Sequence, residues 1–129
     1  MTLATFAYIV GIIELLFGLP MLVSSKKAAA WIRKAFQDDV LIRVIGALFL
    51  VISVLVLLTE GTQIGTDVPG LIRLVAWLTV VKSLIFAWFP DVARDVRDKW
   101  LADSGMRTLW GLLATTIGVL FLLAGRALS

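Results

Sequence analysis

The hydrophobic residues of the chain are gathered in four long runs with few charges among them. The runs cover residues 3–23, 40–59, 71–89 and 106–125. Each is close to the ~20 residues that a helix with a rise of about 1.5 Å needs to cross a hydrocarbon core of about 30 Å. Residues 48–58 lack the period-two alternation of a membrane barrel strand. The pattern therefore predicts an all-α, polytopic membrane protein with four transmembrane helices.

The connections between the runs are of two kinds. Residues 24–37 and 90–103 carry apolar side chains at helical spacing with charged side chains between them. We expect each to form an amphipathic helix in the membrane interface, with a solvated charged face or a surface that docks anionic lipid or a partner. Residues 61–70 contain glycines, Asp67 and Pro69, which favour a tight reversal.

The two halves of the chain repeat the same pattern of span, interfacial helix and returning span. The predicted organisation is a two-helix unit at 1–60, an outward-facing turn at 61–70 and a second two-helix unit at 71–129. In each unit an Asp precedes an Arg by four residues at the start of the returning span, and two small residues seven apart follow on one helix face. These residues are Asp39, Arg43, Gly46 and Ser53, and then Asp103, Arg107, Gly111 and Gly118. Two spans per unit predict parallel repeats, related by an axis along the membrane normal.

This pattern resembles the small two-helix bacterial inner-membrane proteins of the YjeT type, a family of unknown function. The matching residues are Glu14, Trp31, Asp39, Arg43, Gly46 and Ser53 in the first unit and Pro90, Asp103 and Arg107 in the second. The resemblance covers nearly the whole chain as two copies. It implies a tandem fusion of two such units in a bacterial inner membrane, and it brings no known chemistry with it.

Lysine and arginine residues gather at one end of the predicted bundle, which we call side A and which residues 23 and 89 reach. They are Lys26, Lys27, Arg33, Lys34, Arg94, Arg97 and Lys99, with Arg43 and Arg107 just inside. The other end has Arg73 and Arg126. Since cytoplasmic loops carry the excess of positive charge, side A is expected to be cytoplasmic and both termini to lie on the outer, periplasmic side.

Two charged residues lie well inside the predicted spans. Glu14 and Lys82 are at nearly equal depth, roughly 12–14 Å from side A at about 1.5 Å per residue. A charge at this depth costs about 2.5–3.5 kcal/mol on insertion scales. We expect a buried ion pair between the first and third spans that fixes their register. The alternatives are a proton or ion site, or separate partners on another chain.

Two further groups of residues are expected near side A. Arg43 and Arg107 are predicted cytoplasmic-side anchors, which can pair with Asp39 and Asp103 or bind lipid phosphate. Four tryptophans are predicted to form an interfacial aromatic belt. They are Trp31, Trp88, Trp100 and Trp110.

The composition narrows the chemistry that the chain can perform. Hydrophobic residues make up 60% and charged residues 16% of the sequence, and both cysteine and histidine are absent. The absence of these two residue types excludes disulfides, thiolate chemistry and the usual zinc, copper and haem ligands. The sequence predicts no catalytic, metal or cofactor-binding residues. It also predicts no nucleic-acid binding, because the net charge of +3 follows from the positive-inside bias.

This chemistry is compatible to different degrees with three kinds of function. The sequence favours a non-catalytic accessory or scaffold subunit, whose partners are the lipid bilayer and either other membrane proteins or further copies of itself. The alternative is a small proton- or ion-coupled transporter that uses Glu14, since four short spans with a carboxylate midway along the first resemble the small multidrug resistance exporters. An enzyme acting on lipid is disfavoured, because no nucleophile and base are suitably placed.

Overall fold

The computed structural model describes residues 1–129, and all of its regular structure is helical. The six helices are α1 (Leu3–Val23), α2 (Ser25–Ala35), α3 (Asp39–Glu60), α4 (Val68–Trp88), α5 (Pro90–Leu101) and α6 (Ser104–Leu128). Four of them, α1, α3, α4 and α6, are long and apolar enough to cross a membrane. The predicted all-α class and the four long apolar helices are therefore confirmed.

Polar side chains fix where three of the long helices begin. Thr2, Asp38 and Asp67 accept amide hydrogens from the first turns of α1, α3 and α4. Such caps satisfy donors that the helix itself leaves unpaired. After α3 the chain turns at Gly61, whose φ of 95° lies in the left-handed region, and Pro69 occupies the first turn of α4. Residues 61–67 therefore join α3 to α4.

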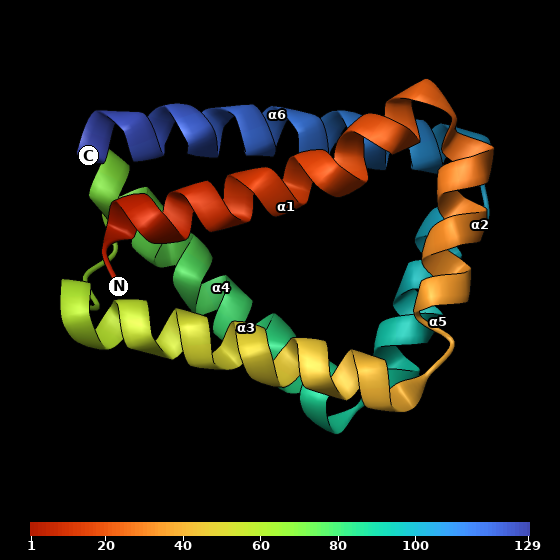
Figure 1. Cartoon of the computed structure of the whole chain (residues 1–129), viewed down its shortest axis with the longest axis horizontal. Helices are drawn as coiled ribbons and strands as arrows, with labels where there is room; N and C mark the ends of the chain where they lie inside the picture. The colour runs from red at the N-terminus through yellow and green to blue at the C-terminus, as the bar shows by residue number, and fades with distance from the viewer.

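The four long helices form two closely packed pairs, α1 with α6 and α3 with α4. In Figure 1 α1 and α6 form one long side of a frame and α3 forms the opposite side, while α4 runs diagonally behind from the end with the chain termini to the far end of α3. The helices α2 and α5 lie side by side across one end. Both termini lie at the opposite end of this frame. Each helix of the second half begins 65 residues after its counterpart, since α1, α2 and α3 begin at 3, 25 and 39 and α4, α5 and α6 at 68, 90 and 104.

Small residues allow close backbone approach within both pairs. A Cβ atom added to Gly46 would lie 2.7 Å from the backbone nitrogen of Ala87, and one added to Gly18 would lie 2.7 Å from the backbone nitrogen of Thr115. Real Cβ atoms do not approach other atoms so closely. The small residues that share one face of α3 and of α6 are all buried; they are Gly46, Ser53, Gly111 and Gly118.

Two clusters of buried apolar side chains hold the frame together at its two ends. The cluster near the termini consists of Leu3, Phe6, Ala7, Val56, Leu57, Ile72 and Ala76, from α1, α3 and α4. The cluster at side A consists of Met21, Ala28, Ala29, Ile32 and Leu101, from α1, α2 and α5. Partly buried side chains farther along the helices pack against the first cluster, among them Val10 of α1, Ile52 of α3 and Val80 of α4.

Candidate functional site

The surface at side A is built by α2 and α5, and the arginines of α5 tie it together. Arg94 pairs with Asp39 at 2.7 Å and donates to the carbonyl oxygen of Gln37 at 3.3 Å. Arg97 donates to the carbonyl oxygen of Phe36, also at 3.3 Å. Both arginines therefore link α5 to the segment that joins α2 to α3.

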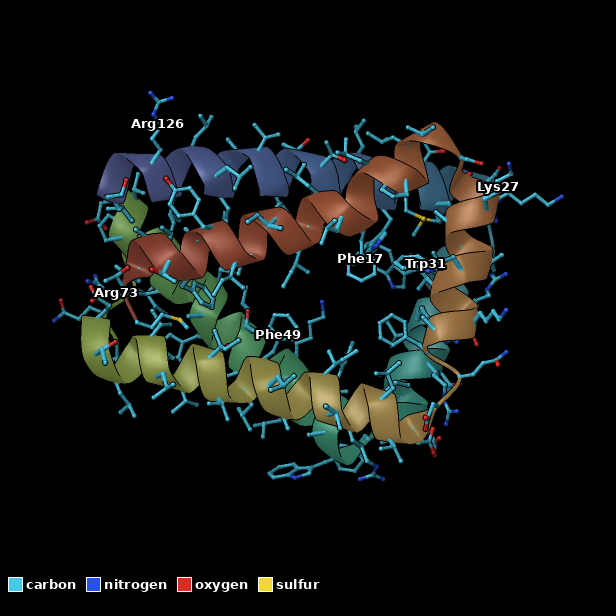
Figure 2. All side chains as sticks on the ribbon, viewed as in Figure 1. Phe17, Lys27, Trp31, Phe49, Arg73 and Arg126 are labelled. Atoms are coloured by element: carbon cyan, nitrogen blue, oxygen red, sulfur yellow. The ribbon has the colours of Figure 1, made fainter.

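The lysines of α2 are free by contrast. Lys26, Lys27 and Lys34 are exposed and form no ion pair within 4.0 Å. Arg33 lies 4.0 Å from Asp98 of α5, and α2 itself contains no acidic residue. Figure 2 shows the Lys27 side chain extending away from the frame, while Arg73 and Arg126 lie at the opposite end. Side A thus presents one helix with uncompensated positive charge.

The two predicted arginine anchors bind carbonyl groups instead of the nearby carboxylates. Arg43 donates to the carbonyl oxygen of Ala87 in the last turn of α4 at 3.1 Å. Arg107 donates to that of Leu101 at the end of α5 at 2.9 Å. The last carbonyls of a helix lack partners within it and carry partial negative charge, so they attract a guanidinium. The pairing of each arginine with the Asp four residues earlier does not form.

The predicted acidic partners of these arginines take other roles. Asp39 binds Arg94 of α5, and Asp103 lies at the N-cap position of α6 without accepting a hydrogen bond there. The neighbouring Asp38 caps α3, accepting from the amide of Val40 at 2.9 Å. The arginine on α5 was missed because its partner lies 55 positions away in the sequence, and no local spacing relates the two.

The four predicted belt tryptophans are all exposed on helices at or near side A. Their exposed fractions are 52%, 64%, 36% and 36% for Trp31, Trp88, Trp100 and Trp110. Trp100 and Trp110 are in contact, with ring centroids 5.1 Å apart and the rings close to edge-to-face. Trp31 contacts Phe17 of α1, with centroids 5.5 Å apart.

Glu14 and Lys82 do not form the direct ion pair expected from the sequence. No ion pair within 4.0 Å joins them, and the Lys82 ammonium lies 5.7 Å from the centre of the Phe86 ring. The reason is the pairing of the helices: α1 packs along α6 and α4 along α3, so α1 and α4 touch little.

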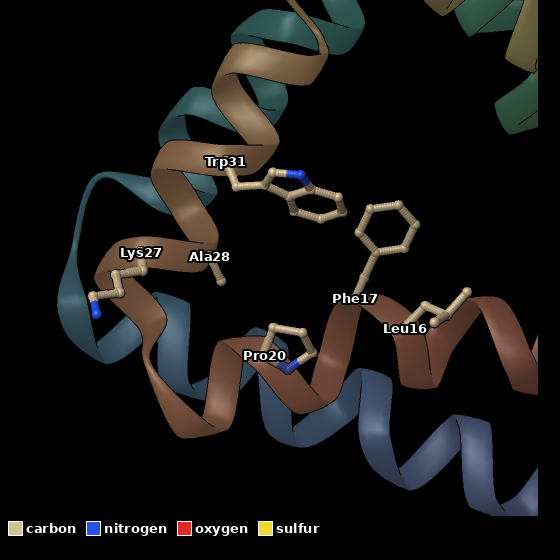
Figure 3. Close-up of a pocket in the computed structure, with 6 residues that line it drawn as sticks. All are labelled: Leu16, Phe17, Pro20, Lys27, Ala28 and Trp31. Carbon is tan, nitrogen blue, oxygen red and sulfur yellow. The ribbon is translucent and has the colours of Figure 1, made fainter.

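A pocket of about 480 Å³ lies where α1 meets α2. It is lined by Leu16, Phe17, Pro20, Lys27, Ala28 and Trp31. In Figure 3 Phe17 and Trp31 point toward one another across the junction, and the Lys27 amine points away from them. Pro20 lies within α1 and lacks the N–H that would bond the preceding turn of the helix.

Comparison of the chain with protein-family models, with curated proteins and with solved structures finds no match. The candidate site is therefore defined by the geometry of this chain alone. It consists of a basic helix with free lysines, an apolar pocket beneath its first turns, and the charged residues Glu14 and Lys82 within two of the long apolar helices.

Proposed function

We propose that this chain is an integral protein of a bacterial inner membrane that crosses the bilayer four times. Side A lies in the cytoplasm and both termini lie on the outer side. Support comes from the outer faces of the long helices, where large apolar side chains are exposed; on α3 the exposed fraction is 75% for Leu58, 66% for Val40 and 58% for Leu48. Such faces suit hydrocarbon as solvent.

The two halves are proposed to be parallel repeats, residues 1–60 and 71–129, joined by the turn at 61–70. The constant 65-residue interval between corresponding helices supports this. So does the choice of partners, because a twofold axis along the membrane normal exchanges α1 with α4 and α3 with α6. It therefore converts the α1–α6 contact into the α4–α3 contact.

The proposed function is that of a non-catalytic accessory or scaffold subunit that associates with other membrane proteins or with itself. The observation that carries this proposal is that the chain uses some of its surfaces for its own packing and leaves others exposed. The small residues are used within the chain, whereas the outer apolar faces and the basic face of α2 remain available for other molecules. Because helix association in lipid depends on packing and polar contacts, such a chain contributes surface to a larger assembly.

The assembly can be tested by comparing two sizes. The tagged chain is extracted from its own membranes in a mild detergent, and its size is compared with that of the chain purified to homogeneity in the same detergent. The proposal expects a native species larger than a single chain: it exceeds the purified protein in size if other proteins are bound, and it matches a purified oligomer if the chain associates with itself. A photo-reactive residue in place of Leu48 should cross-link it to a defined partner, and one at Thr62 in the outer turn should not. A native species the size of the lone chain would contradict the proposal.

A second candidate function, a proton- or ion-coupled transporter, is favoured by one observation. Glu14 lies inside a long apolar helix without a direct ion-pair partner. Intramembrane carboxylates commonly mark ion pathways. The test is flux in liposomes that contain the pure protein, a pH gradient and a panel of cations. Coupled flux that Glu14→Gln abolishes and Glu60→Gln preserves would establish the transporter and displace the accessory role.

A further inference from the structure

The pocket between α1 and α2 combines an apolar wall with a cationic rim. Its wall is formed by Leu16, Phe17 and Pro20 of α1 and by Trp31 of α2. Trp31 remains 52% exposed although it contacts Phe17, so part of its surface is left for another molecule to cover. The pocket has a volume of about 480 Å³ and is widely open on one side, so it offers a groove along the helices and not an enclosed cavity.

The rim of this pocket carries positive charge that nothing in the chain neutralises. Lys27 lines the pocket with its stem, while its ammonium group points away from the aromatic pair. Lys26 adjoins it, and neither lysine forms an ion pair. Long lysine stems can lie against apolar surface while the ammonium group reaches polar surroundings.

The depth of these groups matches the profile of a lipid leaflet. Leu16 and Pro20 precede the end of α1 at Val23 by seven and three residues, which places them roughly 5–10 Å below side A at about 1.5 Å per residue. Lys27 follows the end of α1 and so lies at the level of the headgroups. The apolar wall and the cation are therefore ordered as the acyl chain and the phosphate of a lipid are ordered.

We propose that the α1–α2 junction binds one anionic phospholipid of the cytoplasmic leaflet. An acyl chain packs against Phe17 and Trp31, and the phosphate lies against the Lys27 ammonium. This inference rests on the proposed membrane placement, in which side A faces the leaflet that carries anionic lipid. Charge complementarity selects an anionic lipid over a zwitterionic one, because α2 contains no acid that would repel it.

The proposal is tested by titrating the full chain, purified in a neutral detergent, with phospholipids that carry brominated acyl chains. Bromine quenches nearby indoles, and subtracting the signal of Trp31→Phe isolates Trp31 from the other four tryptophans. Brominated phosphatidylglycerol should quench Trp31 at concentrations at least fivefold lower than brominated phosphatidylcholine. Equal quenching by the two lipids would overturn the proposal.

Matched variants distinguish a specific lipid site at Lys27 from diffuse electrostatic attraction to the whole basic helix. Lys27→Gln should lower the affinity for phosphatidylglycerol about fivefold, as expected for the loss of one basic residue near an anionic surface. Lys27→Arg should keep the wild-type affinity, because it keeps the positive charge. Lys34→Gln, on the same helix but outside the pocket, should change the affinity less than twofold. Equal losses for Lys27→Gln and Lys34→Gln would show a diffuse surface charge and contradict a site.

Soluble competitors identify the source of the anion. Glycerol phosphate and inorganic phosphate carry the headgroup charge without an acyl chain, and they should displace phosphatidylglycerol only at concentrations orders of magnitude higher. Displacement at equal concentrations would show that the site binds phosphate alone, and it would overturn the proposal of a lipid site. The titration needs no bilayer, so its failure leaves the membrane placement to be judged by topology measurements alone.

Discussion

The α1–α6 pair and the α3–α4 pair occupy equivalent places in the frame but achieve their contact differently. Glycines stand on both sides of the α1–α6 contact; they are Gly11 and Gly18 on α1 and Gly111, Gly118 and Gly125 on α6. At the α3–α4 contact the tight approach is at one glycine, Gly46, which meets Ser83, Phe86 and Ala87. Backbone therefore meets backbone along much of one pair and at one point of the other.

This difference shows that close helix packing can depend on one residue or be spread over several residues of a contact. At Gly46 the atoms that an added Cβ would meet are mostly backbone atoms of α4, which cannot rotate away. In the α1–α6 pair the Cβ at Gly18 would meet the backbone nitrogen of Thr115, also at 2.7 Å, whereas at Gly118 and Gly125 the atoms met include side chains of Leu15 and Tyr8, which can move. The α3–α4 pair should therefore be sensitive at one position, and the α1–α6 pair should distribute its sensitivity over several.

The largest effect is expected for Gly46→Leu. The new side chain would have to displace α4, because a Cβ alone already lies 2.7 Å from the Ala87 nitrogen and 2.8 Å from the Ser83 carbonyl oxygen. We expect a loss of at least the about 1–3 kcal/mol typical of overpacking, measured by thermal unfolding in detergent. Ala47→Leu, at the adjacent exposed position, should unfold like the wild type. Equal loss in both variants would mean that Gly46 does not face α4.

Phe6→Ala tests the contact between the two pairs instead of a contact within one. Phe6 is fully buried at the centre of the apolar cluster that joins α1 to α3 and α4. In lipid the transfer part of the usual cost is small and the cavity part remains, so we expect a loss of about 1–3 kcal/mol. Ile12→Ala, on the exposed surface of α1, is the control and should lose less than about 0.5 kcal/mol.

Gly125→Ala should have a smaller effect than any change at Gly46. Its added Cβ would lie 3.2 Å from the Ala4 carbonyl oxygen and the Tyr8 ring, and small adjustments of that ring can relieve the contact. Alanine also favours the helix by up to about 1 kcal/mol over glycine. We expect a change within about 1 kcal/mol of zero, whereas Gly46→Ala, measured in the same way, should be clearly destabilising. The reverse order would remove the distinction between the two pairs.

The smallest effect is expected for Arg94→Gln at side A. The arginine joins α5 to Asp39 and Gln37, but it remains partly exposed, and such ion pairs contribute about 0–1 kcal/mol. Thermal unfolding should change by no more than that. The loss should shrink as salt is added, because screening weakens the ion pair in the wild type as well. A salt-independent loss would assign the role of Arg94 to packing.

Much of the fold was predictable because the length and the exposed face of each single helix follow from the local pattern of apolar and polar residues. Run length and helical spacing gave the six helices, and Asp67 with Pro69 gave the reversal before α4. Partner choice was not predictable from these patterns. The sequence predicted close-packing faces at Gly46 and Gly111, but no local pattern states that the first pairs with α4 and the second with α1.

The candidate site was predictable in its charges and less so in its contacts. The free lysines of α2 and the exposed tryptophans follow from local amphipathicity. The expected pairing of Glu14 with Lys82 assumed that α1 and α4 pack together, and each packs with another helix. Arg43 bonds a carbonyl of α4 for the same reason, since that helix end lies beside α3 only after folding.

The central claim, a four-span protein with α2 and α5 on one side of the membrane, can be tested directly by cysteine labelling. The chain has no cysteine, so Lys27→Cys and Thr62→Cys each introduce a single reporter. A thiol reagent that cannot cross the membrane is added to intact cells and, separately, to inside-out vesicles. The account predicts labelling of position 62 in cells and of position 27 in inside-out vesicles. Labelling of both positions from the same side would contradict it.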